Sequence, residues 1–159
     1  MQVLVLYYSK GGNTKKLAEE IVKGVESTGV RAVLKNTQQV TKEDWVESAG
    51  IIAGSPVYFG VMAAELKEIF DKFVSVRKKT ENKLGAAFTT SGHPTGGKET
   101  TMMSIIQCML IYGMIIVGDP MNASGHYGVG CAGAPDSTAV SDAFKLGARV
   151  AELCKQLEK

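Results

Sequence analysis

The sequence predicts an α/β fold of three layers, α/β/α, built around a five-stranded parallel sheet. Short apolar runs alternate along the chain with segments whose apolar residues recur at helical spacing. The first run has no polar break, which is typical of a parallel strand covered on both faces. Segments rich in glycine, serine and threonine follow the first, third and fourth runs, and they become neighbours if the strand order is 2-1-3-4-5. We expect right-handed crossovers between the strands.

The first half of the chain alternates strand, helix, strand, helix. Residues 1–8 form the first strand, and apolar spacing from Thr14 to Val25 predicts a helix behind it. Gly29 interrupts this pattern, and residues 30–35 mix apolar and basic side chains, as in a strand near a sheet edge. The stretch Thr41–Asp44 has the form of a capping box, which predicts a short helix through residue 47.

The second half of the chain continues the same alternation. We expect strands at residues 49–54, 84–90 and 114–117, and helices at residues 62–74, 102–110 and 136–157, the last one capped by Asp136. Residues 118–135 lie between a strand and a helix and are predicted to form a long loop. Loops of this length are uncommon in compact domains unless they serve a function.

Composition limits the classes of protein to which the chain can belong. Its 159 residues are 45% hydrophobic and 21% charged, which predicts one globular domain over residues 1–159. No apolar run approaches the roughly 20 residues of a membrane span, and no signal peptide precedes the first strand, so we expect a cytoplasmic protein. The net charge of +2 is too small to indicate nucleic-acid binding. Cysteine and histidine spacing predicts neither a disulfide framework nor a metal site.

The first loop, residues 9–14, has the composition of a phosphate-binding turn. It consists of Ser9, Lys10, Gly11, Gly12, Asn13 and Thr14. A turn between a strand and a helix directs free backbone N–H groups and the positive end of the helix at one point. The two glycines permit close approach of an anion, and the short polar side chains supply donors. The alternative is an ordinary capped turn, with Asn13 or Thr14 as the helix cap.

Two further loops are expected at the same edge of the sheet. The second loop, residues 56–60, consists of Pro56, Val57, Tyr58, Phe59 and Gly60, and the third loop, residues 90–97, includes Thr90, Ser91, Gly92, His93, Gly96 and Gly97. Together the loops predict a phosphate site next to a flat apolar slot edged by backbone donors. Flavin mononucleotide (FMN) has the matching shape and chemistry. The alternative for Tyr58 and Phe59 is packing against the core.

Several stretches of the chain resemble the flavodoxin-like flavoproteins, and specifically the WrbA-like branch of NAD(P)H:quinone oxidoreductases. The matching stretches are Tyr8–Thr14, Gly54–Ala63, Thr95–Thr100, Gly113–Gly118 and His126–Gly128. They occur in family order over nearly the whole chain. The first loop by itself is weakly specific, whereas the set as a whole is fairly specific.

The resemblance assigns a role to each loop and adds one residue. It implies that residues 9–14 hold the FMN phosphate, that residues 56–60 line the isoalloxazine ring, and that residues 91–97 close over the ring and ribityl chain. His126 matches a family histidine near the flavin, where it would contact the reducible ring or the substrate as a catalytic residue. The alternative for His126 is a loop histidine that is hydrogen-bonded to backbone.

Two functional classes are compatible with these observations. As an enzyme, the protein would accept hydride from NAD(P)H on FMN and pass electrons to a quinone or a similar small acceptor. As a flavodoxin-type carrier, it would exchange single electrons with redox proteins. The chain lacks segments that WrbA-like proteins carry after the second strand, and those segments help to build their tetramer, so a homo-oligomer stays an open alternative. Its sequence pI of about 8.4 differs from that of the acidic flavodoxins.

Two glycine motifs are near matches to other nucleotide-binding signatures. Residues 92–99 follow the triphosphate-loop pattern until Glu99, which stands where a hydroxyl should meet Mg²⁺. Residues 128–133 have the spacing G-x-G-x-x-G, but no strand ending in an acidic residue follows them. We therefore expect neither a phosphate-transfer enzyme nor a dinucleotide fingerprint.

Overall fold

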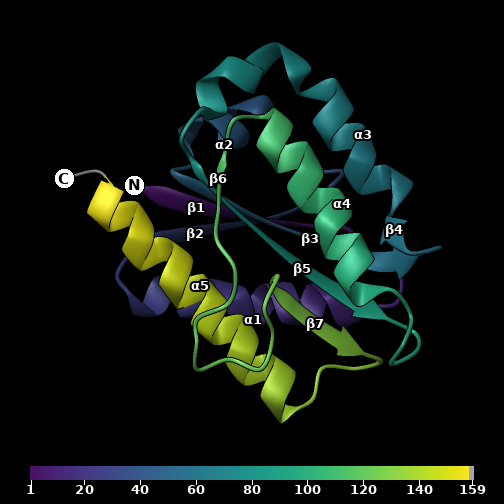
Figure 1. Ribbon diagram of the computed structural model, residues 1–159. Helices are drawn as coiled ribbons and strands as arrows, with labels where there is room; N and C mark the ends of the chain where they lie inside the picture. Colours follow the sequence, from purple (N-terminus) through teal and green to yellow (C-terminus); the bar gives the residue numbers. More distant parts are fainter. Residues whose placement is uncertain (158–159) are drawn as a thin grey trace.

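The computed structural model describes residues 1–157, and within them one sheet runs through the middle of the molecule with helices on both faces (Figure 1). The strands are β1 (Gln2–Tyr7), β2 (Arg31–Asn36), β3 (Gly50–Tyr58), β4 (Val61–Met62), β5 (Leu84–Ser91), β6 (Ile115–Ile116) and β7 (Val129–Ala132). The main path of the sheet is β2-β1-β3-β5-β6, with all neighbours parallel. Since β5 and β6 are the fourth and fifth strands expected from the sequence, the predicted order 2-1-3-4-5 is confirmed.

The helices divide between the two faces of the sheet. They are α1 (Asn13–Ser27), α2 (Lys42–Glu47), α3 (Ala64–Lys72), the 3₁₀ helix η1 (Val74–Thr80), α4 (Lys98–Ile111) and α5 (Ser137–Leu157). Helices α1 and α5 cover one face and pack against each other, while α2, α3 and α4 cover the other (Figure 1). The three-layer architecture predicted from the sequence is therefore present.

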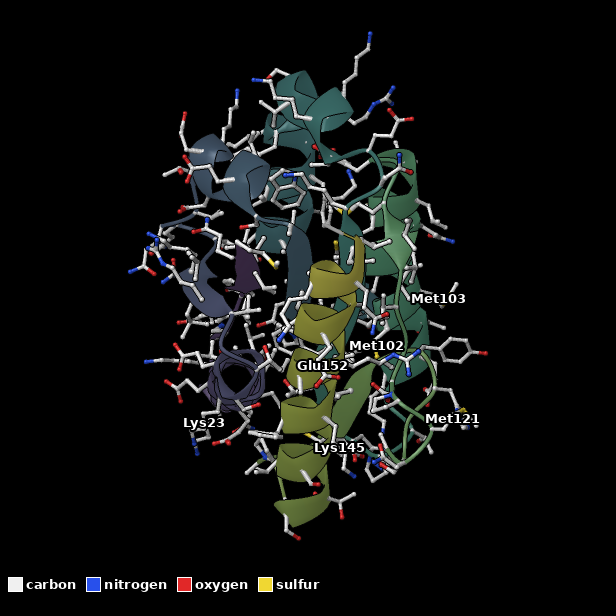
Figure 2. The ribbon with its side chains drawn as sticks, turned by 90° about the vertical axis from the view of Figure 1, so that its left-hand side faces the viewer. Lys23, Met102, Met103, Met121, Lys145 and Glu152 are labelled. Atoms are coloured by element: carbon white, nitrogen blue, oxygen red, sulfur yellow. The ribbon has the colours of Figure 1, made fainter. Side chains whose placement is uncertain are left out.

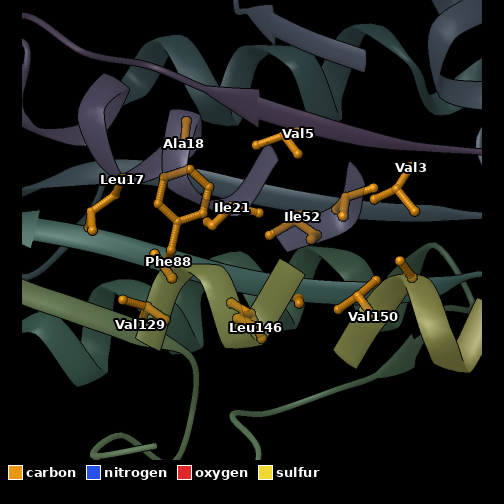
Figure 3. Close-up of a cluster of buried hydrophobic side chains, with 14 of the residues drawn as sticks. Val3, Val5, Leu17, Ala18, Ile21, Ile52, Phe88, Val129, Leu146 and Val150 are labelled. Carbon is orange, nitrogen blue, oxygen red and sulfur yellow. The ribbon is translucent and has the colours of Figure 1, made fainter. Parts of the chain in front are cut away.

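The two faces are packed differently. On the first face, Val5, Ile52 and Phe88 meet side chains of α1 and α5 (Figure 3). Helices α1 and α5 approach closely at Gly24, where an added Cβ would lie 2.0 Å from the Phe144 carbonyl oxygen. The second face is built around an aromatic cluster. The buried Trp45 makes T-shaped contacts, with ring centroids 5.5 Å away, to Phe70, Phe73 and Tyr112.

Three boundaries differ from the sequence-based expectation. Strand β3 continues through Tyr58 and turns back into β4, because residues 55–58 pair with β5 and then with β4. The helix expected at 62–74 ends at Lys72 and is followed by η1. The predicted loop 118–135 contains β7, which pairs with Phe88–Ser91 of β5, whereas β6 pairs with Leu84 and Gly85. The fifth strand is thus split in two, and residues 117–128 form an excursion between its halves.

Other local predictions are confirmed. The Thr41 side chain accepts a hydrogen bond from the Asp44 backbone N–H, and the Asp44 side chain accepts one from the Thr41 N–H, which together form the capping box of α2. Gly29 follows α1 with φ of 81°, a conformation that glycine adopts without strain. Residues 128–133 include β7 and do not form the turn of a dinucleotide fingerprint.

Candidate functional site

The first loop leaves the end of β1 and enters α1 through a left-handed glycine. Gly12 has φ of 91° and stands at the N-cap position of α1, where no side chain makes a capping hydrogen bond. The Ser9 hydroxyl accepts a hydrogen bond from the Gly12 N–H at 3.1 Å, which fixes the turn. The alternative of a turn capped by Asn13 or Thr14 is therefore wrong. The backbone N–H groups of the first turn of α1 receive no side-chain acceptor.

The same feature recurs at the other helices that begin at this edge of the sheet. Helix α3 follows β3 and helix α4 follows β5, and neither has a side-chain cap; α4 begins at Gly97, which has φ of 92°. By contrast, α2 has its capping box, and the Asp136 carboxylate accepts a hydrogen bond from the Ala139 N–H at the start of α5, as predicted. Helices α1 and α4 thus keep their N-terminal donors free of side-chain caps, whereas in α3 the N–H of the N-cap residue Ala63 is accepted by the Ser55 hydroxyl.

The structure brings the three loops together. The hydroxyls of Thr14 and Thr90 lie 2.8 Å apart in a buried hydrogen bond that joins the first loop to the third. The rings of Tyr8 and Tyr58 meet edge to face at 6.3 Å and bring the first loop next to the second. The second and third loops touch at Gly60 and Gly97, where an added Cβ on Gly97 would lie 3.1 Å from the Gly60 Cα. The predicted convergence is confirmed.

The second loop is the turn of the β3–β4 hairpin, and it exposes aromatic side chains. Phe59 is fully exposed and has φ of 51°, a strained conformation for a bulky residue. Tyr58 is 37% exposed, whereas Pro56 and Val57 are half-buried. The alternative that Phe59 packs into the core is wrong. A strained and fully solvated aromatic ring is unfavourable for the isolated chain, and it is the arrangement expected of a ligand contact.

The third loop is folded tightly on its own hydrogen bonds. Thr90 and Ser91 are buried, and the Ser91 hydroxyl donates to the His93 carbonyl at 2.7 Å. Gly92 and His93 are exposed, and Gly96 and Gly97 lead into α4. The His93 Nδ1 atom accepts a hydrogen bond from the Thr95 N–H at 3.2 Å.

Two hydroxyl groups that the sequence analysis did not select hold these loops in position. The buried Ser55 hydroxyl accepts the Ala63 N–H at 2.7 Å and donates to the Pro56 carbonyl at 2.7 Å, which ties the hairpin to the start of α3. Thr89 donates to the Ser55 carbonyl at 2.7 Å between β5 and β3. The sequence offers one indication of this role: Ser55 and Thr89 each stand where an apolar strand ends and a loop begins.

A polar contact lies where the first and second loops meet. A hydrogen bond from the Tyr8 hydroxyl to the Glu65 carboxylate, helped by desolvation, raises the pKa of Tyr8 to about 12. Tyr58 lies beside the same hydroxyl and raises its pKa further. Tyr8 therefore stays protonated at neutral pH and acts as a hydrogen-bond donor.

His126 lies in the excursion before β7 and lines a cavity of about 450 Å³ together with Lys98, Asp119 and Asp142. Lys98 directly follows the third loop. A contact of His126 with a flavin or substrate stays a prediction.

Two aspartates beneath this excursion have opposite environments. The Asp142 carboxylate accepts hydrogen bonds from the Ser124 N–H, at 3.0 Å, and from its hydroxyl, and it pairs with Lys145; these contacts lower the pKa of Asp142. Lys145, which projects from α5 (Figure 2), also donates to the Asn122 carbonyl at 2.8 Å and so ties α5 to the excursion. Both carboxylate oxygens of Asp119 are buried without a hydrogen-bond partner, and burial, with Asp142 nearby, raises the pKa of Asp119 to about 6.

Within residues 1–157, no cluster of three or more histidine, cysteine, aspartate or glutamate side chains is arranged to hold a metal ion. Among the same residues, no helix is both long and apolar enough to cross a bilayer.

Comparison with known proteins gives three concordant findings. A family model described as NADPH-dependent FMN reductase matches residues 32–128. The chain is 31% identical to an NAD(P)H dehydrogenase (quinone) from Archaeoglobus fulgidus, over 98% of each chain, and 34% identical to a flavodoxin from Aquifex aeolicus, over 95% of this chain and 85% of the other. The crystal structure of a flavodoxin, WrbA-like protein from Agrobacterium tumefaciens, superimposes with a TM-score of 0.84 at 23% identity, covering 98% of each chain, which shows the shared fold.

Replacing Asp119 with asparagine should stabilise the fold in a pH-dependent manner. The folded pKa of about 6 lies above the unfolded value of 3.8, so the ionised carboxylate opposes folding above pH 6, and this penalty disappears as the pH falls below 3.8. We expect Asp119→Asn to raise the free energy of unfolding by about 1–3 kcal/mol at neutral pH and to match the parent near pH 4, measured by urea denaturation.

Asp142→Asn is the matched control, because the pKa of Asp142 is lowered in the folded state. Its ionised form stabilises the fold above the unfolded pKa, so this variant should be less stable than the parent at neutral pH. Equal destabilisation by both substitutions would contradict the assigned environment of Asp119.

Proposed function

The chain belongs to the NADPH-dependent FMN reductase family of flavodoxin-like flavoproteins, and on that premise we propose that it binds FMN and passes electrons from NAD(P)H to a quinone or a similar acceptor. The observation that carries the proposal is the convergence of three uncapped helix N-termini beside an exposed aromatic hairpin. Such an edge supplies donors for a phosphate and a wall for a flat ring, which is what FMN requires.

The residues at this edge fit the phosphate end of FMN. Around Gly11 and Gly12 an added Cβ would meet nothing within 4 Å, so the surface above the turn is open. The N–H groups at the start of α1 and the Ser9–Gly12 turn would bind the phosphate oxygens, and Lys10 would add a positive charge. The Thr14 hydroxyl is held by Thr90 and keeps the turn against the third loop.

The ring end is supported by the second and third loops. Phe59 and Tyr58 would cover the apolar faces of the isoalloxazine, and backbone groups of residues 91–97 would supply hydrogen-bond donors along its polar edge. When bound, a flavin supplies a centre that exchanges hydride or single electrons. The contribution of this chain is to bind and orient that group, and Phe59 would exclude water from it.

Two activities share this site, and a different relative supports each. The family description and the Archaeoglobus fulgidus relative support an enzyme that uses NAD(P)H, whereas the Aquifex aeolicus relative supports an electron carrier. We favour the enzyme, because a formal net charge of +2 gives the chain no overall attraction to basic redox partners.

Direct reduction by a nicotinamide donor separates the two activities. The FMN-loaded protein, mixed without oxygen with NADPH or NADH, should lose its flavin absorbance within seconds to minutes, and an added quinone should restore it. The measurement is absorbance under anaerobic conditions. Failure of both donors, with full reduction by dithionite, would support the carrier instead.

Gly12→Val should abolish FMN binding, because Gly12 adopts a positive φ that a β-branched residue cannot hold without strain. The dissociation constant measured by calorimetry should rise at least about a hundredfold, since the charge-assisted contacts of the turn depend on this conformation. The control is Gly29→Val, which also has a positive φ and open space but lies at the far end of α1. If both variants bind FMN equally, residues 9–14 are not the phosphate site.

Phe59→Asn should raise the free energy of unfolding and, at the same time, weaken the binding of FMN. Phe59 and Gly60 have φ of 51° and 81°, and Asn-Gly is the preferred pair for such a hairpin turn. We expect a gain of about 1 kcal/mol in the free energy of unfolding and a loss of about fivefold or more in FMN affinity. Val74→Asn, which removes another exposed apolar side chain, should leave FMN affinity unchanged. An undiminished FMN affinity in Phe59→Asn would exclude Phe59 from the ring site.

A further inference from the structure

A cavity of about 450 Å³ lies along β7, between the start of α4 and the start of α5 (Figure 1). Residues 128–132 all line it, because β7 pairs with β5 on one side and leaves its other edge open within the described part of the chain. Residues 124–127 of the excursion line it as well. The contacts proposed above for FMN come from the three loops, so this cavity has no role in them.

One wall of the cavity carries a carboxylate that the protein leaves without a partner. Asp119 lines the cavity and is only 9% exposed, and within residues 1–157 neither of its side-chain oxygens makes a hydrogen bond. Gly125 packs against it so closely that an added Cβ would lie 2.0 Å from Asp119 Oδ2. Burial of a charged group is unfavourable unless a counter-charge compensates for it.

Neighbouring side chains do not provide that counter-charge. Asp142 on α5 is close to Asp119, but it is negative itself and already pairs with Lys145 at 3.4 Å. His126 in the excursion and Arg149 on α5 attract the Asp119 carboxylate. Among the described residues, however, neither of them forms an ion pair with it within 4.0 Å. A cation inside the cavity would therefore meet a carboxylate that is still available.

The other lining side chains also suit a cation. Glu99 and Asp136 line the cavity together with Lys98, which is its one lysine among the described residues, so the carboxylates are in excess. Tyr127 is 50% exposed and lines the cavity too, and the face of an aromatic ring attracts ammonium and guanidinium groups. Met102 adds an apolar surface for a short aliphatic chain.

The backbone of β7 adds hydrogen-bonding groups. The Gly133 N–H donates to the Ser91 carbonyl at 2.7 Å, on the side of β5. In a parallel ladder, the residues that alternate with it direct their N–H and C=O groups to the opposite side. The backbone groups of Gly130 and Ala132 therefore face away from β5, along the edge that the cavity follows.

We propose that this cavity binds a small organic cation, an alkylammonium or guanidinium group on a short chain, with Asp119 as its counter-ion. Tyr127 contacts the charged head, and the free backbone groups of β7 bind other polar atoms of the ligand. The volume is within the roughly 300–1,000 Å³ of small-molecule sites. The inference does not rest on the proposed function.

The test is a titration of the whole chain followed by NMR chemical shifts. The probes are n-butylammonium and n-butylguanidinium, with 1-butanol as a neutral analogue of the same chain. At pH 7.5 the cations should bind at least about tenfold more tightly than 1-butanol, because charge-assisted hydrogen bonds are stronger than neutral ones. Asp119→Asn should lose at least about tenfold in affinity for the cations and keep its affinity for 1-butanol. The matched control is Asp71→Asn, since Asp71 pairs with Lys67 and does not line the cavity.

A second variant reduces the cavity without changing its charge. An added Cβ on Gly130 would lie 3.4 Å from the Lys98 side chain, which is an ordinary contact, and the backbone of Gly130 is not left-handed. Valine is favoured in strands, so Gly130→Val should fold as the parent does. Its side chain should occupy part of the cavity and lower the affinity for both cations at least about fivefold.

The pH dependence of binding identifies Asp119 as the counter-ion. Because the pKa of Asp119 is about 6, a proton competes with the cation as the pH falls, and the affinity should drop about tenfold between pH 7.5 and pH 5. The lowered pKa of Asp142 keeps that carboxylate charged in this range. Since protonation of His126 would also repel the cation, the series is run in His126→Asn. The drop should persist there and disappear when Asp119→Asn is added.

The proposal is overturned if the cations bind no more tightly than 1-butanol. It is also overturned if Asp119→Asn binds the cations as Asp71→Asn does, or if Gly130→Val binds them as the parent does. FMN takes no part in these measurements, so these failures would leave the proposed function intact.

Discussion

The structure depends on backbone N–H groups that stay unpaired at one edge of the sheet. An unpaired donor is unfavourable for a folded chain unless water or a ligand reaches it. Here Gly12 and Gly97 open α1 and α4 in left-handed conformations, and neither helix receives a side-chain cap. The chain does cap α2 and α5. The selective absence of caps therefore supports the phosphate site that we propose at this edge.

The rest of the fold holds that edge in place. Close packing of α1 against α5 at Gly24 fixes the axis of the helix whose end points at the site. The hydroxyl groups of Ser55, Thr89, Thr14 and Thr90 join the ends of β3 and β5 to each other and to the starts of α3 and α1 by buried hydrogen bonds. Because these contacts tie the helix starts to the strand ends, the loops between them are held at fixed separations, which binding without reorganisation requires.

The sequence predicts the layers, the strand order and the convergence of the loops, because apolar periodicity and turn composition are local properties. It does not predict the β3–β4 hairpin or β7. Residues 55–58 look like a loop in the sequence, and they form a strand only because β5 and β4 lie alongside them. The sequence also does not predict that Phe59 is exposed or that the buried Asp119 carboxylate has no hydrogen-bond partner, since both depend on neighbours distant in the chain.

The most direct test of this account compares FMN with riboflavin, which lacks only the phosphate, by calorimetry on the flavin-free protein. If the uncapped start of α1 binds a phosphate dianion, FMN should bind at least about a hundredfold more tightly than riboflavin at neutral pH. Equal affinities for the two flavins, or no heat of binding with FMN, would contradict the account.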